Sequence, residues 1–377
     1  MPEQTSRVST LELFFDLVFV FTITQVALIV EHRPSWTTTA QAFIELLVIY
    51  WMYGGFAWLT NSLRASLPRQ RVALLLGMAA FLVVSLAVPR AFEGDGVVFG
   101  VAYLALNIVH LVSFLVLGQS TTFAAMLRIG AANLAAAGLI LAAGFVHGAA
   151  HWPFWIAAVA IQYVLPIFAR TVGSFTIGVE HFAERHGLMI IIVLGESLVS
   201  VALAAQRLPV DATLIVGALC GLAASAAMWW CYFGGEDAAA AAALERLPPR
   251  ERGYAALVGY DAPHVVMMAG IVSVAAGSRL SLPELTAPAP NAAAWFIGGG
   301  VAVYLLALAV FRALLRFAVP LGRALFGLLA LATVPVGTGL GAAQQLLVIA
   351  GLIVVLLLAE RRGSSWFGQL DRAGWPP

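Results

Sequence analysis

The chain has 377 residues, of which 62% are hydrophobic and only 10% are charged. Ordinary soluble domains carry about 25% charged residues, so this composition excludes a water-soluble fold. The basic residues are all arginines, and the formal net charge is only +1. No basic field is available to bind a nucleic acid, which excludes that class of partner.

Long apolar runs without period-2 alternation predict an all-α polytopic integral membrane protein. Only helices and closed barrels satisfy backbone polar groups in lipid, and barrel strands would alternate. A bilayer core needs about 20 apolar residues per helix. On that length we predict about 12 transmembrane helices, near residues 11–30, 40–60, 72–89, 97–117, 126–146, 152–169, 187–204, 211–233, 257–277, 292–311, 322–336 and 342–359.

The arginines set the predicted orientation, because cytoplasmic loops collect Arg. With both termini cytoplasmic, 16 of the 20 arginines lie on the inner side. The last two segments have a second interpretation, a re-entrant hairpin around Pro335, which also leaves the C-terminus inside.

Twelve helices divide into two six-helix halves, residues 1–170 and 171–377, within a single membrane domain without a soluble domain. An even half-count would relate these halves by parallel repetition about the membrane normal. A comparison of the first predicted helix with the seventh gives only isolated identities.

Ionisable residues inside the predicted helices are the candidates for function. A charged side chain at mid-membrane costs at least about 2.5 to 3.5 kcal/mol, so such groups usually face a cavity or each other. Many of them lie one helical turn from a second polar residue, as Glu12 does from Asp16. The candidate pathway for a solute or proton consists of Glu12, Asp16, Asn107, His110, Glu196, Ser200, Asp261 and His264.

Depth in the membrane suggests that four of these residues belong together. At 1.5 Å per residue, Asp16, His110 and His264 lie about 8 to 11 Å from the cytoplasmic boundary, with Glu196 about a turn deeper. We therefore expect the four to share one cavity. Each has a structural alternative, such as a hydrogen-bonded core histidine. Glu45 lies outside this layer, and a structural role is expected for it.

Two further features have a predicted role. Pro263 lacks an N–H and clashes with the preceding turn, so a hinge is expected there. The charge-rich stretch with His181, Glu184, Arg185 and His186 forms a cytoplasmic motif. It fits either a cap at the headgroup layer or a set of metal ligands, and the sequence leaves both open.

Three segments resemble the signatures of the bacterial low temperature requirement A (LtrA) family. They are the run Glu12–Phe21, the segment from His181 to Ser197, and the residues Tyr260, His264 and Gly270-Ile271. The resemblance implies a multi-pass protein of the bacterial cytoplasmic (inner) membrane. The Asp261-Ala-Pro263 insertion departs from the third signature, so the resemblance supports Asp261 less than His264.

Two functions fit these features. The first is a secondary transporter or proton/ion-coupled translocator, because burial moves carboxyl groups and imidazoles toward neutrality and lets both exchange protons near physiological pH. The alternative is an intramembrane metal-dependent lipid-modifying hydrolase using the same side chains. The partners expected are the lipid bilayer and a small solute, ion or lipid substrate. No cofactor is indicated, and the enzyme is a less favoured hypothesis than the translocator.

Overall fold

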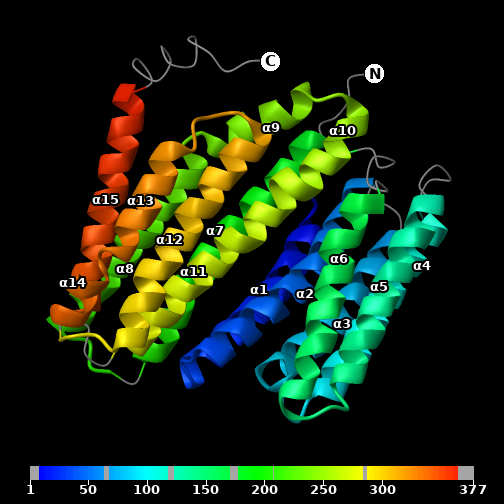
Figure 1. The fold of residues 1–377 in the computed structure, drawn as a ribbon, viewed down its shortest axis with the longest axis horizontal. Coiled ribbons are helices and arrows are strands. Elements are labelled where there is room, and N and C mark those ends of the chain that lie inside the picture. Colours follow the sequence, from blue (N-terminus) through cyan, green and yellow to red (C-terminus); the bar gives the residue numbers. More distant parts are fainter. Residues whose placement is uncertain are drawn as a thin grey trace. The chain divides into compact units, whose positions relative to one another are not determined.

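The computed structural model describes residues 8–62, 68–117, 123–169, 177–206, 208–282 and 287–363. These ranges form helices without a strand (Figure 1). The helices are α1 (Thr10–His32), α2 (Trp36–Ser62), α3 (Pro68–Ala87), η1 (Val88–Arg90), α4 (Gly96–Leu117), α5 (Phe123–Ala143), η3 (Gly148–His151), α6 (Trp152–Ala169), α7 (Val179–Ala205), α8 (Ala212–Phe233), α9 (Glu236–Arg246), α10 (Pro249–Tyr254), η5 (Ala255–Asp261), α11 (Ala262–Leu280), α12 (Asn291–Leu315), α13 (Leu321–Leu331), α14 (Val334–Gly339) and α15 (Ala342–Gly363).

The all-α polytopic fold is confirmed. Among the described residues, 11 helical segments are long and apolar enough to cross a membrane. The remaining predicted segment, 187–204, lies inside α7, which begins at Val179 and carries Glu180, Glu184 and Arg185 in its first turns. The hydropathy pattern placed the start of this helix too late. Charged side chains lower the local hydropathy as a loop does, even when their partners lie inside the fold.

The chain divides into two compact units. The first unit contains residues 1–196 and 238–265, and the second contains residues 197–237 and 266–377. In these units α7 up to Glu196 lies with the first six helices, and the two six-helix halves stay a prediction. Whether the two halves arose by repetition stays a prediction.

Within the first unit, α1 packs against α2 and α3, and α4 packs against both α3 and α5. Helix α2 also contacts α4 and α6, so it lies among several neighbours, and most of its middle is buried. Within the second unit, α15 packs against α8, and α12 packs against α13.

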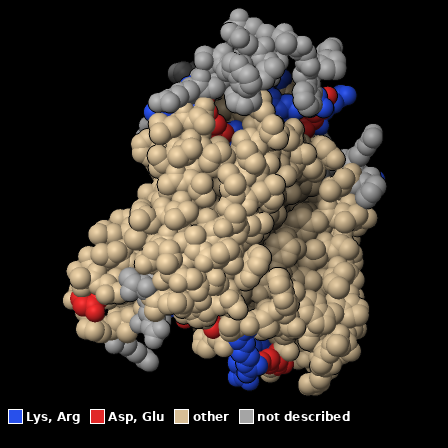
Figure 2. All heavy atoms as spheres, turned by 60° about the vertical axis from the view of Figure 1, so that its left-hand side comes forward, with Lys and Arg blue, Asp and Glu red and all other residues tan. Residues whose placement is uncertain are grey.

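The surface fits a lipid environment. On the face drawn in Figure 2, charged side chains gather near the helix ends, and a broad uncharged band lies between them. Large apolar side chains such as Leu86, Val116 and Leu219 are exposed on this protein. Exposed apolar area of this extent indicates contact with lipid chains, in agreement with a multi-pass membrane protein.

A π-helical turn lies just before Pro263. Residues Ala255–Asp261 form this turn, and the N–H of Ala262 bonds back to the carbonyl of Leu257. A π turn inserts an extra residue into the helical repeat and so changes the direction of the side chains that follow. Asp261, the last residue of the turn, is thereby placed on a buried face. The hinge role of Pro263 stays a prediction.

Candidate functional site

The N-terminal half of α7 presents side chains on two faces. His181 and Arg185 are one turn apart on one face, and Phe182 and His186 are one turn apart on the next. The first pair contacts α1 and α2, and the second pair contacts the π turn η5 and the start of α11. Helix α7 therefore connects two polar networks of the first unit.

Asn61, at the end of α2, fixes the start of α7. Its Oδ1 accepts a hydrogen bond from the N–H of Gly178 at 2.9 Å, and its Nδ2 donates to the carbonyl of Gly178 at 3.0 Å. The same Nδ2 lies 3.3 Å from Nδ1 of His181. An amide nitrogen only donates, so this Nδ1 accepts, and the proton of a neutral His181 ring is on Nε2.

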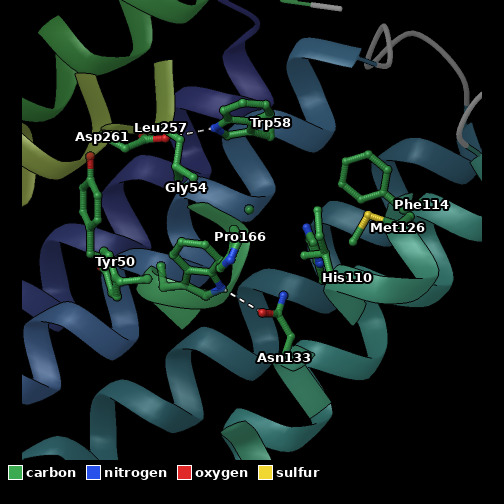
Figure 3. A pocket seen from close by; sticks show the side chains of 14 residues that line it. Tyr50, Gly54, Trp58, His110, Phe114, Met126, Asn133, Pro166, Leu257 and Asp261 are labelled. Carbon is green, nitrogen blue, oxygen red and sulfur yellow. Dashed lines mark hydrogen bonds between the residues drawn. The ribbon is translucent and has the colours of Figure 1, made fainter. Parts of the chain in front are cut away.

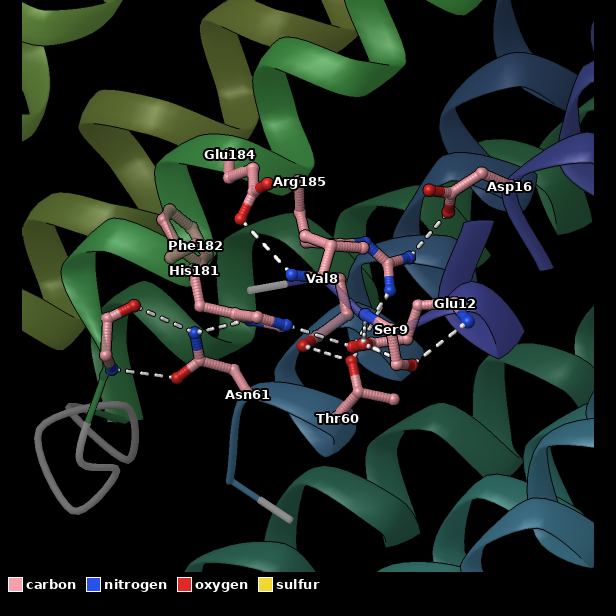
Figure 4. A network of polar contacts seen from close by, with 12 residues as sticks. Val8, Ser9, Glu12, Asp16, Thr60, Asn61, His181, Phe182, Glu184 and Arg185 are labelled. Atoms are coloured by element: carbon pink, nitrogen blue, oxygen red, sulfur yellow. Dashed lines mark hydrogen bonds and ion pairs between the residues drawn. The ribbon is translucent and has the colours of Figure 1, made fainter. Parts of the chain in front are cut away.

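The first network, called here the arginine network, consists of Glu12, Asp16, Tyr53, His181 and Arg185. Figure 4 shows Glu12, Asp16, His181 and Arg185 of this network. Nη2 of Arg185 donates to Oδ1 of Asp16 at 2.6 Å and to the hydroxyl of Tyr53 at 3.1 Å. The Tyr53 hydroxyl itself donates to the same Asp16 oxygen at 2.7 Å. Oε1 of Glu12 lies 3.1 Å from Nε2 of His181 and 3.3 Å from Nη1 of Arg185.

Glu12 has a second role as a helix cap. Its Oε2 accepts hydrogen bonds from the N–H and the hydroxyl of Ser9 at 2.8 and 2.7 Å, and the Glu12 N–H points back to the Ser9 hydroxyl. This reciprocal arrangement is a capping box, which satisfies backbone donors at the start of α1. The cap fixes the rotamer of Glu12 and so directs its other oxygen toward α7.

The arginine network carries surplus negative charge. Its described side chains are two carboxyl groups, one guanidinium and one imidazole, so the net charge is −1 when both acids are ionised and the imidazole is neutral. Asp16 is 1% exposed, and its Oδ2 makes no hydrogen bond to any described residue. Because buried surplus charge is costly, this oxygen is the natural position for one bound proton.

The second network centres on a hydrogen bond between Asp261 and His186. Nε2 of His186 lies 2.7 Å from Oδ1 of Asp261, and Nδ1 of His186 lies 2.8 Å from the carbonyl of Phe182. The other carboxylate oxygen of Asp261 accepts from the indole N–H of Trp58 at 3.1 Å. Both partners are buried, with His186 fully inaccessible to solvent.

The contacts of the Asp261–His186 pair require one hydrogen between its two groups. A backbone carbonyl only accepts, so Nδ1 of His186 carries a hydrogen. The contact at Nε2 then needs a second hydrogen, which belongs either to the imidazole or to the carboxyl group. The pair is then either an imidazolium with a carboxylate or an imidazole with a carboxylic acid, and its total charge is zero in both cases. The His264 ring lies 4.8 Å from the His186 ring, and Nδ1 of His264 donates to the carbonyl of Tyr260 at 2.7 Å.

A pocket lies beside this pair, among α2, α4, α5, α6 and η5 (Figure 3). Its volume is about 80 Å³, and Asp261 is one of the residues that line it. The other lining residues are mostly aromatic or apolar. They are Tyr50, Trp51, Gly54, Gly55, Trp58, His110, Phe114, Met126, Ile129, Asn133, Tyr163, Pro166 and Leu257.

His110 presents its imidazole to this pocket from α4. The side chain is 3% exposed, and neither ring nitrogen makes a well-formed hydrogen bond to a described residue. The ring lies against the backbone of Gly55, where an added Cβ would be only 2.9 Å from Nε2. Phe56 and Phe114 pack around the ring, with centroids at 5.3 and 5.1 Å. The imidazole is therefore held in place by packing and keeps its hydrogen-bonding capacity.

Comparison with known proteins identifies the family. The family model described as bacterial low temperature requirement A protein (LtrA) matches residues 7–359. The chain belongs to the LtrA family. It is also 28% identical over 207 residues to an uncharacterized protein of Rhizobium meliloti (strain 1021), a match that covers 52% of this chain and 51% of that protein. The similarity thus spans about half the length of that relative, and no solved structure matches the chain.

The structure divides the four residues that were predicted to share one layer of this LtrA protein. Asp16 belongs to the arginine network, and His110 lines the pocket. His264, on α11, packs against His186, which lies on a different face of α7 from Arg185. Glu196 is half-buried and lies almost three turns beyond His186, about 15 Å along the helix. Depth along a helix does not fix the direction of a side chain, which is why the single cluster is not formed.

The charge-rich motif that was predicted to be cytoplasmic has three of its four side chains buried. His181, Arg185 and His186 lie inside the networks, whereas Glu184 accepts a hydrogen bond from the N–H of Val8 at 3.2 Å. Within the described ranges, no three His, Cys, Asp or Glu side chains are arranged to hold a metal ion. The motif's polar atoms instead bind carboxyl groups, a hydroxyl and an amide.

The remaining predicted residues are placed as follows. Asn107 is buried on the same stripe of α4 as Tyr103 and His110, and its Nδ2 donates to the carbonyl of Tyr103 at 2.8 Å. The side chain of Ser200 lies outside the described residues. The roles of these residues in a pathway stay predictions.

Sequence reasoning missed the contribution of α2. Tyr53, Trp58, Thr60 and Asn61 each contact one of the two networks, yet none of them is charged. A signal was available in the spacing, because Tyr53 and Thr60 lie two turns apart and so share one face of α2. Polar residues on one face of an otherwise apolar helix indicate a buried polar neighbour.

The second unit contains a separate ionic network that is balanced. Nη1 of Arg312 lies 2.7 Å from Oε1 of Glu360, and Nη2 of Arg323 lies 3.0 Å from Oε2 of the same residue. Both arginines also pair with Glu236. Two cations thus meet two anions among these described side chains, which fits a structural role and contrasts with the surplus charge in the first unit.

Proposed function

We propose that this LtrA protein is a proton-coupled translocator of the bacterial cytoplasmic membrane. In this proposal the pocket of the first unit receives the solute, and the Asp261–His186 pair carries the proton. One observation supports this assignment above the others: Asp261 lines the pocket and at the same time shares a hydrogen bond with His186. A single carboxyl group therefore contacts both the space for a solute and a proton acceptor.

Occupancy of the pocket and protonation of the pair are then linked. Charges interact strongly where the surroundings have a low dielectric constant, so a solute beside Asp261 changes the relative free energies of its protonation states. By reciprocity, the protonation state changes the affinity for the solute. This linkage is the thermodynamic basis of coupled transport.

The arginine network has a supporting role in this proposal. Arg185 joins α7 to α1 and α2 through Asp16 and Glu12, and the open oxygen of Asp16 is a second position for a proton. Loss or gain of that proton changes the net charge that holds α7 to α1. The π turn and Pro263 are the place where the start of α11 changes conformation, because π turns are frequent at functional sites.

The metal-dependent hydrolase has no support from the described residues, because they contain no set of three clustered ligands. The ligands considered for it were His110, His264, Asp16 and Glu196, and the structure places these four side chains in different surroundings. We therefore retain the translocator as the single proposal.

Reconstituted protein with a trapped pH-sensitive dye tests the proposal. Proteoliposomes are challenged with a panel of small amines, amino acids and carboxylates, and uptake of each is followed with radiolabelled compound. A transported solute is expected to change the internal pH, and the Asp261→Asn variant is expected to lose this change. Asp95→Asn is the matched control, because Asp95 pairs only loosely with Arg90 at the surface.

Two results would contradict the proposal. The first is uptake of a solute by wild-type protein without any pH change. The second is a pH change of normal size in Asp261→Asn, which would assign the proton to other groups.

A further inference from the structure

We propose that the pocket of the first unit binds a small organic ammonium ion, which exchanges for the proton of the Asp261–His186 pair. The exchange rests on the proposed function. The ligand class rests on the chemistry of the pocket lining alone, and the two parts can fail separately.

Three aromatic residues of the pocket lining have polar groups that already bind protein atoms. The indole N–H of Trp51 donates to Oδ1 of Asn133 at 2.9 Å, and that of Trp58 donates to Asp261. The hydroxyl of Tyr163 donates to the carbonyl of Leu47 at 2.8 Å. These polar tips already have protein partners, so a ligand meets the rings chiefly through their π systems. Ring faces carry partial negative charge and attract cations, above all quaternary ammonium groups.

The polar atoms left in the pocket favour a cation as well. Asp261 is the acidic residue of the lining, and His110 offers a ring nitrogen that makes no well-formed hydrogen bond to the described residues. The described lining contains neither lysine nor arginine. An anion would thus be repelled by the π faces and by the carboxyl group, and no cationic side chain of the described lining would offset this. An ammonium ion is attracted by both the π faces and the carboxyl group.

The size of the pocket limits the ligand. A buried water needs about 10 to 15 Å³ of cavity volume, so about 80 Å³ holds several waters or one small organic molecule. Choline is a suitable probe, because its trimethylammonium head suits an aromatic lining and its hydroxyl can donate to His110. Its neutral carbon analogue, 3,3-dimethylbutan-1-ol, has the same shape and the same hydroxyl without the charge.

The proton balance of the exchange is simple. Before binding, the pair holds one shared proton and is neutral, as an imidazolium carboxylate or as imidazole and carboxylic acid. When the ammonium ion enters, the carboxyl group is ionised, His186 keeps only the Nδ1 hydrogen, and the shared proton leaves to water. No covalent bond of the ligand changes. One cation replaces one proton, so the site stays neutral.

Calorimetric titration of the purified full-length protein tests both parts. Choline and 3,3-dimethylbutan-1-ol are each titrated in two buffers of different ionisation enthalpy, which gives the affinity and the number of protons released. We expect choline to bind at least about tenfold more tightly than the alcohol, because only choline has the charge that the ring faces attract. We also expect about one proton released per choline bound.

The Asp261→Asn variant sharpens the test. We expect it to lower the affinity for choline about tenfold or more and to abolish proton release, while binding of the neutral alcohol is unchanged and shows that the pocket is folded. Asp95 is a half-exposed acid outside the pocket, and Asp95→Asn is expected to behave as wild type.

Each other outcome has a definite meaning. Equal affinities for choline and the alcohol, or no choline binding at millimolar concentration, would overturn the ligand class and leave the proton-coupled function standing. Selective choline binding without proton release would uphold the ligand class and contradict proton coupling. Unchanged choline binding by Asp261→Asn would overturn the assignment of the carboxyl group.

Discussion

At the residue scale, Arg185 shows how one buried cation is stabilised by several helices. It is 1% exposed, and it contacts Glu12, Asp16, Tyr53 and Thr60. A buried charge is tolerated only when its partners are well placed, and removal of one partner leaves the other uncompensated. Because one arginine faces two acids, removal of the arginine and removal of one acid should change the free energy of unfolding by different amounts.

Substitution of Arg185 and of Asp16 should therefore have unequal effects on stability. Arg185→Met leaves two buried carboxyl groups without a counter-charge and should lower the free energy of unfolding by about 3 to 5 kcal/mol. Asp16→Asn removes the surplus charge and keeps an oxygen for Arg185 and Tyr53, so the loss should stay within about 1 kcal/mol. Unfolding in mild detergent measures both, and equal losses would show that the net charge of the network was assigned wrongly.

Glu45 is a second residue with a testable protonation state. It is fully buried in α2, and neither carboxyl oxygen makes a hydrogen bond to a described residue. A lone buried carboxylate is far more costly than a neutral acid, so Glu45 is expected to carry a proton.

Replacement of Glu45 by a neutral side chain should thus cost little or stabilise the fold. Glu45→Met should raise the free energy of unfolding by about 1 to 3 kcal/mol, the cost of an unsatisfied buried polar group. Infrared difference spectra between wild type and Glu45→Gln should show the loss of a protonated carboxyl band. A severe loss of stability in Glu45→Met, or an ionised carboxylate band, would mean that Glu45 has a charged partner.

At the element scale, hydropathy predicted the helices well and their faces poorly. The predicted segment 97–117 matches α4 (Gly96–Leu117), because lipid-facing apolar runs determine where such helices lie. The start of α7 was missed, since its buried His181 and Arg185 are satisfied by partners that are far away in sequence. Asp16, His110 and Asp261 were identified as chemically informative, but which of them meet depends on helix rotation, and a single sequence does not encode that directly.

Two adjacent glycines of α2 offer a test of the contact between helices α2 and α4. A Cβ at Gly54 would lie 3.8 Å from Oδ1 of Asp261, an ordinary contact, whereas a Cβ at Gly55 would lie 2.9 Å from Nε2 of His110. Alanine inside a helix gains roughly 0.5 to 1 kcal/mol over glycine.

Gly54→Ala should therefore stabilise the protein by about 0.5 to 1 kcal/mol, while Gly55→Ala should lose that gain because the imidazole of His110 must move. Gly55→Ala should also weaken binding at the pocket, which the choline titration detects. The two variants serve as controls for each other. Equal stabilisation by both would mean that His110 does not lie against α2.

At the scale of the whole molecule, the two compact units differ in electrostatics. The ionic network of the second unit is balanced, with Arg312 and Arg323 facing Glu236 and Glu360. The first unit holds the arginine network, in which two acids face one guanidinium, and also the Asp261–His186 pair and the pocket. In the function proposed above, this distribution puts the proton chemistry in the first unit and gives the second unit a supporting role.

The most direct test of this account is the protonation of His186 itself, measured by ¹⁵N magnetic resonance of protein labelled at its histidines and assigned with His186→Asn. In the absence of ligand, Nδ1 should carry a hydrogen and Nε2 should show a proton shared with Asp261. With a transported solute bound, we predict that the Nε2 resonance shifts to that of a deprotonated nitrogen. A His186 spectrum that is unchanged by a transported solute would contradict the central role of the Asp261–His186 pair.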